Sequence, residues 1–260
     1  MNFKTEKLTL QHGNAEIISI QTNDQNSLTK SSMQEFAGMI ENLKKDESIK
    51  GVILTSENHK FFCNGIDANT VSHLPKDEIA DFMSWICILF GILLKFDKPL
   101  IAEVTGHAMG GGAVLTIACD YKFMLETGCR IGFTEVMFGL PLPGMFVYKI
   151  QESLHPTKVN EVCLEAKQYK AKEAKEVGLI DETALTREGI RDLSIQKFET
   201  LFGYPASAIR HTKANINQKS LLNFEEHLKN ARENFTDPII SENLMEAMKA
   251  FKEKRKPVFK

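Results

Sequence analysis

Three consecutive glycines, Gly110 to Gly112, constrain the fold of this chain more than any other feature of its sequence. The apolar run at 100–104 before them is typical of a buried strand, and the apolar run at 113–118 after them is typical of a buried helix. Glycines at such a junction carry no side chain to block a ligand, and the first N–H groups of a helix favour negative charge. The turn therefore predicts a site for a phosphate or for a developing oxyanion.

The residues around the glycines argue against a nucleotide phosphate loop. A P-loop has Lys-Ser or Lys-Thr directly after its glycines, whereas Ala113 and Val114 follow here. A dinucleotide fingerprint has the spacing Gly-x-Gly-x-x-Gly and follows the first strand of its unit, but this cluster lies deep in the chain. A purely structural role, in which the glycines let a helix and a strand pack closely, stays open at this point.

A second strand end also turns through a glycine. Residues 60–67 read Lys-Phe-Phe-Cys-Asn-Gly-Ile-Asp and follow the apolar run at 51–55. Together the two turns resemble those of the crotonase (enoyl-CoA hydratase/isomerase) superfamily, which usually read Phe-Ser/Cys-Ala-Gly-x-Asp and Gly-x-x-x-Gly-Gly-Gly. In that family each turn supplies one backbone N–H to an oxyanion hole for a thioester carbonyl. The resemblance implies Ile66 and Gly111 as the donors.

The resemblance extends over nearly the whole chain. Three further segments are similar to family motifs and follow in the expected order, at 131–136, 171–181 and 251–257. Each motif is weak alone, and their order and separations make the match specific. The resemblance implies an α/β fold, a crotonase-like spiral of ββα units with a C-terminal helical subdomain.

Strand and helix patterns alternate in the first part of the chain, which is typical of an α/β protein. Strands are expected at 17–20, 51–55, 100–105, 120–125 and 130–133, and helices at 29–44 and 76–95. From about residue 186 onward the sequence shows only helical patterns, at 186–202, 205–219, 221–235 and 238–255. We therefore expect a spiral core at 1–185 and a helical subdomain at 186–260. In the family such helices form the trimer interface and cover the acyl pocket; helices that only cap their own core are the alternative.

The composition excludes several classes of partner. A formal net charge of −2 gives no reason to expect nucleic acid or an anionic membrane. The longest apolar stretch, 85–94, is too short to span a bilayer, and the N-terminal residues lack an apolar signal core. The 5 cysteines show no Cys-x-x-Cys pair and no metal-ligand spacing. We expect a cytoplasmic protein with reduced thiols, no bound metal and no membrane contact.

Glu135 is the candidate acid/base. It is the only charged residue in the otherwise mostly apolar run 131–140. A carboxylate buried among Phe and Met side chains must be paired, protonated or functional, and burial raises its pKa towards the value that a general base needs. A Glu that faces solvent at a strand end is the alternative. In the family this position holds a catalytic Glu.

Val114 marks a departure from part of the family. Hydratases carry a second Glu at this position, because water addition uses two carboxylates to hold and split one water molecule. A single carboxylate facing an apolar Val suits a proton shuttle from C2 to C4 of one acyl chain. Members that resemble the Δ3,Δ2-enoyl-CoA isomerases keep only the Glu that corresponds to Glu135, and their segment is similar to 131–143.

Other polar residues have simpler explanations. Asp120 ends the helix that follows the glycines and is expected to be structural. Glu103 is a possible displaced second acid, but strand alternation and ion pairing explain it more simply. His107 is close enough in sequence to the glycines to approach a thioester, while a packed imidazole explains it as well.

The resemblance also implies residues for the coenzyme A part of a substrate. These are Asp67 and Ala68 after the first turn, Gly110 in the second turn, and Phe251 and Lys254 in the last helix. A Lys near a phosphate acts as a point charge. A solvated charged tail is the alternative explanation for the lysines.

The sequence therefore predicts an isomerase that converts 3-enoyl-CoA to 2-enoyl-CoA, with Glu135 as sole acid/base. An enoyl-CoA hydratase, another lyase or hydrolase of this type, and a non-enzymatic acyl-CoA-binding protein are the alternatives. We expect no cofactor apart from coenzyme A within the substrate, and a homotrimer or a dimer of trimers.

Overall fold

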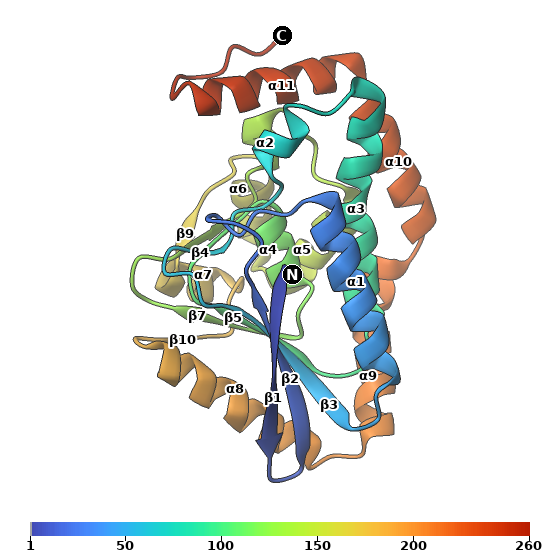
Figure 1. Ribbon diagram of the computed structural model, residues 1–260, viewed down its shortest axis with the longest axis vertical. Helices are drawn as coiled ribbons and strands as arrows, with labels where there is room; N and C mark the ends of the chain where they lie inside the picture. Colours follow the sequence, from blue (N-terminus) through green and yellow to red (C-terminus); the bar gives the residue numbers. More distant parts are fainter. Residues whose placement is uncertain (1) are drawn as a thin grey trace.

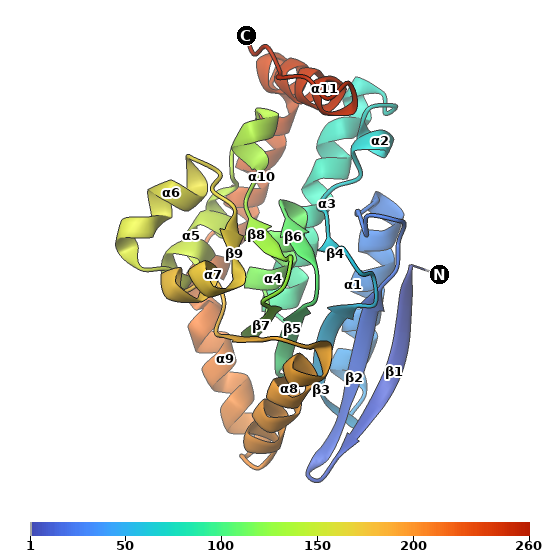
Figure 2. The ribbon, with the colours of Figure 1, turned by 90° about the vertical axis from the view of Figure 1, so that its left-hand side faces the viewer.

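The structure is a computed structural model that describes residues 2–260, and its strands form two sheets (Figure 1, Figure 2). The strands are β1 (Phe3–Leu10), β2 (Gly13–Ile20), β3 (Ile49–Ser56), β4 (Phe61–Cys63), β5 (Leu100–Val104), β6 (His107–Met109), β7 (Tyr121–Leu125), β8 (Arg130–Gly132), β9 (Tyr169–Lys170) and β10 (Glu182–Ala184). The larger sheet has the order β1-β2-β3-β5-β7-β10, and the smaller sheet has the order β4-β6-β8-β9.

Helices surround the two sheets. They are α1 (Lys30–Lys45), α2 (Ala68–Val71), α3 (Lys76–Leu94), α4 (Gly111–Ile117), α5 (Gly144–Ser153), α6 (Val159–Cys163), α7 (Ala171–Val177), α8 (Arg187–Phe202), α9 (Ala206–Leu221), α10 (Phe224–Thr236) and α11 (Pro238–Lys252), with 3-10 turns η1 (Glu135–Phe138) and η2 (Pro156–Lys158). Helices α3 and α10 lie side by side, and α11 crosses one end of the molecule beside α2 (Figure 1, Figure 2). Within residues 2–260 no helix combines the length and apolar character needed to cross a bilayer.

The chain builds the sheets as a spiral. Each turn places one strand in the larger sheet and the next strand in the smaller one, as β3 with β4, β5 with β6, and β7 with β8. The ladders β3–β5–β7 and β4–β6–β8 are parallel, so equivalent strand ends meet at the same edge of each sheet. This arrangement confirms the predicted α/β crotonase-like spiral. It also brings the turns after β4 and β6 together, because these two strands are neighbours.

The helix at α1 illustrates how local sequence sets an element. The Thr29 hydroxyl accepts a hydrogen bond from the Ser32 N–H at 3.2 Å, and the Thr29 N–H donates to Ser32 Oγ at 2.9 Å. This reciprocal cap satisfies N–H groups that a helix start leaves without partners. The apolar residues Met33, Phe36 and Ile40 follow at helical spacing and are buried.

The first hairpin differs from the expectation. The sequence predicts a strand only at 17–20, whereas β1 and β2 form an antiparallel pair from Phe3 to Ile20. Strand β1 lies at the edge of the larger sheet and is mostly exposed, so it lacks the apolar run that signals a buried strand. Strands β4 and β6 are also absent from the expectation, because three residues are too few to show a period.

The helices after residue 186 agree with the predicted helical patterns. Apolar residues of α10 and α11, such as Phe235 and Leu244, belong to the same hydrophobic cluster as Leu54 of β3 and Ala102 of β5. These helices therefore extend the core of the strand region. The division into domains at 1–185 and 186–260 stays a prediction.

Glu103 on β5 is buried in an ion pair. Its side chain is 2% exposed. The Arg191 guanidinium group of α8 donates two hydrogen bonds to it, from Nε to Oε1 at 2.7 Å and from Nη2 to Oε2 at 2.9 Å. A two-point pair of this kind satisfies the carboxylate in a low-dielectric setting. Glu103 therefore fixes α8 to the larger sheet, in agreement with the ion-pairing explanation.

We predict that Arg191→Met destabilises the protein, because it leaves the buried Glu103 carboxylate without a cation. The free energy of unfolding should fall by about 3 kcal/mol, near the lower end for losing one partner of a buried pair, since Arg191 is partly exposed. Urea titration followed by circular dichroism measures this. Lys4→Met is the control, because Lys4 and Glu57 form an exposed pair whose loss should leave stability almost unchanged. Similar midpoints for the two variants would contradict the prediction.

Candidate active site

Two glycine turns meet at the edge of the smaller sheet. Gly65 follows β4 with φ of +81°, and Gly110 follows β6 with φ of +48°, both in the range that favours glycine. A Cβ atom on Gly65 would lie 2.8 Å from the Met109 carbonyl oxygen and 3.1 Å from the Gly111 nitrogen. The two turns therefore touch through their backbones, and a side chain at Gly65 would separate them.

The third glycine of the triplet, Gly112, is required by close packing. A Cβ atom there would lie 2.0 Å from the Cys63 carbonyl oxygen, so the first turn of α4 packs directly against the end of β4. Close helix–strand packing is thus the role of Gly112. Gly110 and Gly111 instead face the cavity described below.

Two backbone N–H groups are available at this junction. The Leu28 N–H donates to the Gly65 carbonyl at 2.7 Å and the Asp67 N–H donates to the Leu28 carbonyl at 2.9 Å, a parallel bridge that leaves the Ile66 N–H unused. Gly111 is the first residue of α4, so its N–H has no acceptor one turn earlier in the helix. Among the loop, turn and cap bonds of residues 2–260, neither N–H donates to a carbonyl.

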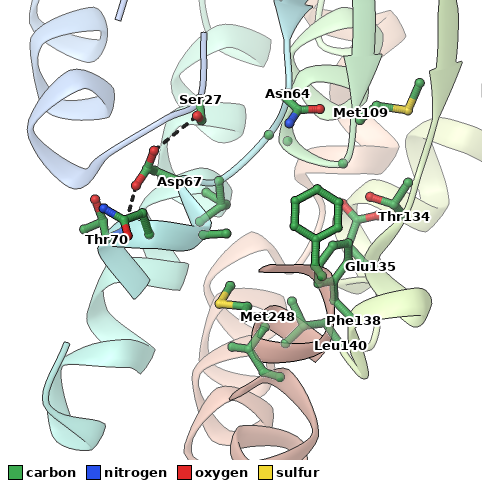
Figure 3. A pocket seen from close by; sticks show the side chains of 18 of the residues that line it. Ser27, Asn64, Asp67, Thr70, Met109, Thr134, Glu135, Phe138, Leu140 and Met248 are labelled. Atoms are coloured by element: carbon green, nitrogen blue, oxygen red, sulfur yellow. Dashed lines mark hydrogen bonds between the residues drawn. The ribbon is translucent and has the colours of Figure 1, made fainter. Parts of the chain in front are cut away.

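A cavity of about 1640 Å³ opens over the two turns (Figure 3). Both turns, α2, η1, α5 and α11 contribute to its wall. The part of the wall formed by α3, η1, α5, α10 and α11 is rich in apolar side chains. These include Met83, Ile86, Phe138, Phe146, Phe235, Leu244 and Met248. The cavity thus combines backbone donors with an apolar surface, as small-molecule sites commonly do.

Glu135 begins η1 and points into this cavity (Figure 3). Its Oε2 atom is buried and has no hydrogen-bond partner within residues 2–260. Burial raises the pKa of Glu135 to about 7, which a hydrogen bond from backbone offsets only in part. A Cβ atom on Gly110 would lie 3.7 Å from Glu135 Oε1, so the carboxyl group stands over the glycine turn. A carboxyl group with this pKa can both accept and donate a proton near neutral pH.

The hydroxyl of Thr134 lies on the same side of the turn, and the sequence analysis missed it. Its Oγ1 atom would be 3.2 Å from a Cβ atom on Gly110, and Thr134 lines the cavity beside Glu135 (Figure 3). A lone Thr before a Glu gives no signal in a single sequence. Only the 3-10 turn at η1 places both side chains over Gly110.

No second carboxylate stands at the position of Val114. The Val114 side chain is fully buried in the core and is absent from the cavity wall, and its N–H donates to the Gly110 carbonyl at 3.0 Å. Asp120 accepts a hydrogen bond from the Leu100 N–H and another from Lys213 Nζ, at 2.7 and 2.6 Å. Asp120 therefore has the structural role that was expected.

Asp67 caps a helix at the cavity wall. Its Oδ1 accepts from the Thr70 N–H at 2.7 Å, and its Oδ2 accepts from the Ser27 hydroxyl at 3.2 Å (Figure 3). These bonds hold the first turn of α2, where Ala68 lines the cavity. Asp67 thus shapes the loop, and its carboxylate oxygens are engaged within the protein.

His107 also lines the cavity. Its ring packs against that of Phe61 at 5.8 Å, and its Nδ1 atom is buried with no partner within residues 2–260. Burial, together with the cations of Lys60 and Arg130, lowers the pKa of His107. The imidazole is therefore a neutral group at neutral pH.

Of the two residues predicted in the last helix, one lines the cavity and the other does not. Phe251 lines the cavity, with its ring 6.1 Å from that of Phe138. Lys254 lies outside the wall, because α11 ends at Lys252 and Lys254 adopts a left-handed conformation with φ of +55°. Lys249 and Lys252 line the cavity instead. The sequence analysis missed them, although their spacing of three residues places them on one helix face.

Comparison with known proteins agrees with this geometry. The chain is 27% identical to an enoyl-CoA isomerase/hydratase of Mycosarcoma maydis over 83% of this chain and 78% of that protein. It is 28% identical to the mitochondrial methylglutaconyl-CoA hydratase of Homo sapiens over 90% of this chain and 70% of that protein. In fold it is similar to the human mitochondrial Δ3,Δ2-enoyl-CoA isomerase, with a TM-score of 0.90, 19% identity and 98% of both chains covered.

The family model described as enoyl-CoA hydratase/isomerase matches residues 12–260, which include both glycine turns and Glu135. That match covers strands β2 to β10 and the helices up to α11, and β1 lies before it. The chain therefore belongs to the enoyl-CoA hydratase/isomerase family, the crotonase superfamily that its two glycine turns resemble.

Proposed function

We propose that this protein moves a double bond from the 3-enoyl-CoA to the 2-enoyl-CoA position, with Glu135 as its sole acid/base. Family membership makes it a crotonase-type enzyme of acyl-CoA thioesters. The observation that supports the finer proposal is the Glu135 carboxyl group. Within residues 2–260 its Oε2 atom has no hydrogen-bond partner, its pKa is about 7, and it stands over the turn that contains the unused Gly111 N–H.

The proposed reaction begins with the thioester carbonyl at the two turns. Its oxygen accepts hydrogen bonds from the N–H groups of Ile66 and Gly111, so these two groups form an oxyanion hole. The Glu135 carboxylate removes a proton from C2, and the electron pair delocalises into a dienolate whose charge rests on that oxygen. The protonated Glu135 then returns the proton to C4. The double bond moves from C3–C4 to C2–C3, and the carboxylate is restored.

One carboxylate supports isomerisation over hydration. Adding water to a double bond requires one group to deprotonate the water and another to protonate the carbon. At the second family position the buried Val114 supplies neither group. Glu103 and Asp120 are held by Arg191 and Lys213, so neither is a substitute.

A hydratase is the second candidate function. Thr134 Oγ1 lies beside Glu135 at the cavity, where a hydroxyl group can hold a water molecule. A hydroxyl with an ordinary pKa is a poor acid or base near neutral pH, so this arrangement supports at most slow hydration.

The proposal extends to the location, the oligomeric state and the cofactor requirement of the enzyme. We propose that it is cytoplasmic, and the buried, unpaired state of all cysteines in residues 2–260 supports this. We also propose a homotrimer or a dimer of trimers, supported by exposed apolar residues such as Ile216 and Leu222 near the end of α9. Its reaction needs no cofactor apart from the coenzyme A of the substrate.

We predict that the wild-type enzyme converts 3-hexenoyl-CoA mainly to 2-hexenoyl-CoA. Hydration of 2-hexenoyl-CoA should be slower by about a hundredfold, because the second acid/base is missing. Initial rates of both products, resolved by chromatography and mass, measure the ratio. Mainly 3-hydroxyhexanoyl-CoA would show a hydratase, and binding without turnover of either ester would show an acyl-CoA-binding protein.

We predict that Glu135→Gln lowers isomerase turnover by at least about a hundredfold, because an amide cannot transfer the proton. The Kd for hexanoyl-CoA, measured by titration calorimetry, should stay close to that of the wild type. The exposed Glu57→Gln variant is the matched control and should keep full turnover. Full activity of Glu135→Gln would assign proton transfer to another group.

We predict that kcat/KM for 3-hexenoyl-CoA rises with pH and levels off above an inflection near 7. Glu135 must be ionised to act as the base, and burial raises its pKa to about 7 in the free enzyme. The protonated form therefore dominates below this value, and activity falls as pH decreases. Rates between pH 5 and 9 at constant ionic strength provide the test. An inflection near the pKa of an exposed Glu would contradict the proposed burial effect.

A further inference from the structure

The chain reverses direction after α11 and runs back along that helix (Figure 1). Lys254 has φ of +55°, and the Arg255 N–H donates to the Ala250 carbonyl at 3.0 Å, which closes the helix end. We name residues 253–260 the strap. It lies over the helix that forms one wall of the cavity.

The strap binds one face of α11 through polar contacts. Arg255 holds Glu246 at two points, with Nη1 at 2.5 Å from Oε1 and Nη2 at 3.0 Å from Oε2. The Val258 N–H also donates to Glu246 Oε1, at 2.9 Å. Lys260 reaches further back, and its Nζ lies 2.5 Å from Glu242 Oε2. The strap thus supplies a cation to each of two acidic residues of α11.

The same two acidic residues belong to the cavity wall. Glu242 and Glu246 line it together with Lys249 and Lys252 of the same helix. In residues 2–260 neither of these lysines forms an ion pair. Without the strap, the Glu246 carboxylate would lose its two-point partner and would offset part of the positive charge of Lys249 and Lys252. With the strap, Glu246 is paired with Arg255, and the two lysines supply the remaining charge.

Glu246 cannot lose its charge by protonation under ordinary conditions. The hydrogen bonds from Arg255 and from the Val258 N–H lower the pKa of Glu246 to about 2. Arg255 itself is also bound to Glu253, with Nε 2.6 Å from Oε2, so its side chain is fixed on both sides. Neutralisation of Glu246 therefore depends on Arg255.

We propose that the strap masks Glu246 of α11 and thereby raises the affinity of the cavity for the phosphate-bearing end of coenzyme A, with Arg255 as the positioning residue. The inference rests on the proposed function, which places an acyl-CoA in this cavity. Charges within about one Debye length, roughly 10 Å at 0.1 M salt, act on each other across a partly exposed site. An unmasked carboxylate in the wall repels each phosphate that approaches it.

The test measures binding rather than turnover. Titration calorimetry gives the Kd of coenzyme A and of pantetheine, which lacks the nucleotide phosphates, at 0.05 M and 0.5 M salt. Arg255→Gln should raise the Kd of coenzyme A by about threefold to tenfold at low salt and by less at high salt. The Kd of pantetheine should change little. In the isomerase assay the variant should show a raised KM with nearly unchanged kcat.

Two further variants separate charge masking from mechanical support. Arg210→Gln removes a cation of α9 that pairs with Asp97, away from the cavity, and should leave every constant unchanged. The double variant Arg255→Gln/Glu246→Gln removes the carboxylate that Arg255 neutralises, and should restore the Kd of coenzyme A to near the wild-type value. Circular dichroism and thermal midpoints establish that each variant is folded.

Each outcome decides the inference. An unchanged Kd for coenzyme A in Arg255→Gln, or a wild type that does not bind coenzyme A, would overturn it. A double variant as weak as Arg255→Gln would also overturn masking and leave the strap as a mechanical support for α11. Failure of the proposed isomerase appears separately, as coenzyme A binding that depends on Arg255 without conversion of 3-hexenoyl-CoA.

Discussion

The rest of the site depends on the backbone contact between the turn after β4 and the start of α4. This contact has no room for side chains, because a Cβ atom on Gly112 would lie 2.0 Å from the Cys63 carbonyl oxygen. The spiral makes the contact possible, since β4 and β6 are parallel neighbours whose ends meet. Once the two turns touch, the N–H groups of Ile66 and Gly111 stand at one junction, without another acceptor in the part of the chain that the structure describes. Their position is therefore a property of the fold.

The carboxylates near the sheets show two ways of burying a charge. Glu103 is bound at two points by Arg191, and Asp120 is bound by Lys213 and a backbone N–H. These pairs offset the desolvation of the carboxylate and hold elements together. Glu135 has no such cation within residues 2–260, and the result is a raised pKa. Unlike Glu103 and Asp120, Glu135 thus stands over an open cavity as a group able to exchange protons.

Much of the site could be predicted from the sequence, because glycine turns and a lone Glu in an apolar run are local features. Gly65, Gly110 and Glu135 signal backbone conformation and desolvation within a few residues of chain. The edge strand β1 and the short strands β4 and β6 gave weaker signals, since their stability comes from neighbouring strands.

Lys254 lies outside the cavity wall for a reason that the local sequence does not show. A helix pattern predicts which face a residue occupies, but the end of α11 depends on the left-handed residue that closes it and on the strap that packs behind it. Once the helix ends at Lys252, the next lysine turns away from the cavity, and the charges that line it come from one turn earlier. Ion pairs such as that of Arg255 with Glu246 join residues whose partnership no spacing rule specifies.

The cavity wall combines polar groups on the turns with apolar side chains of the helices. The polar groups of the proposed reaction lie between residues 65 and 135, on turns that the sheets hold rigidly. The apolar wall comes largely from helices, with Phe235 on α10 and Met248 on α11 facing those turns. Helix side chains can change size without moving a strand end, so the apolar wall can vary while the two glycine turns stay in place. The 3-10 turn at η1 links the two parts, because it presents Glu135 to the glycine turn and packs Phe138 against Phe251 of α11. Phe138 and Phe251 thus join the turn that carries the proposed base to the helix that the strap contacts.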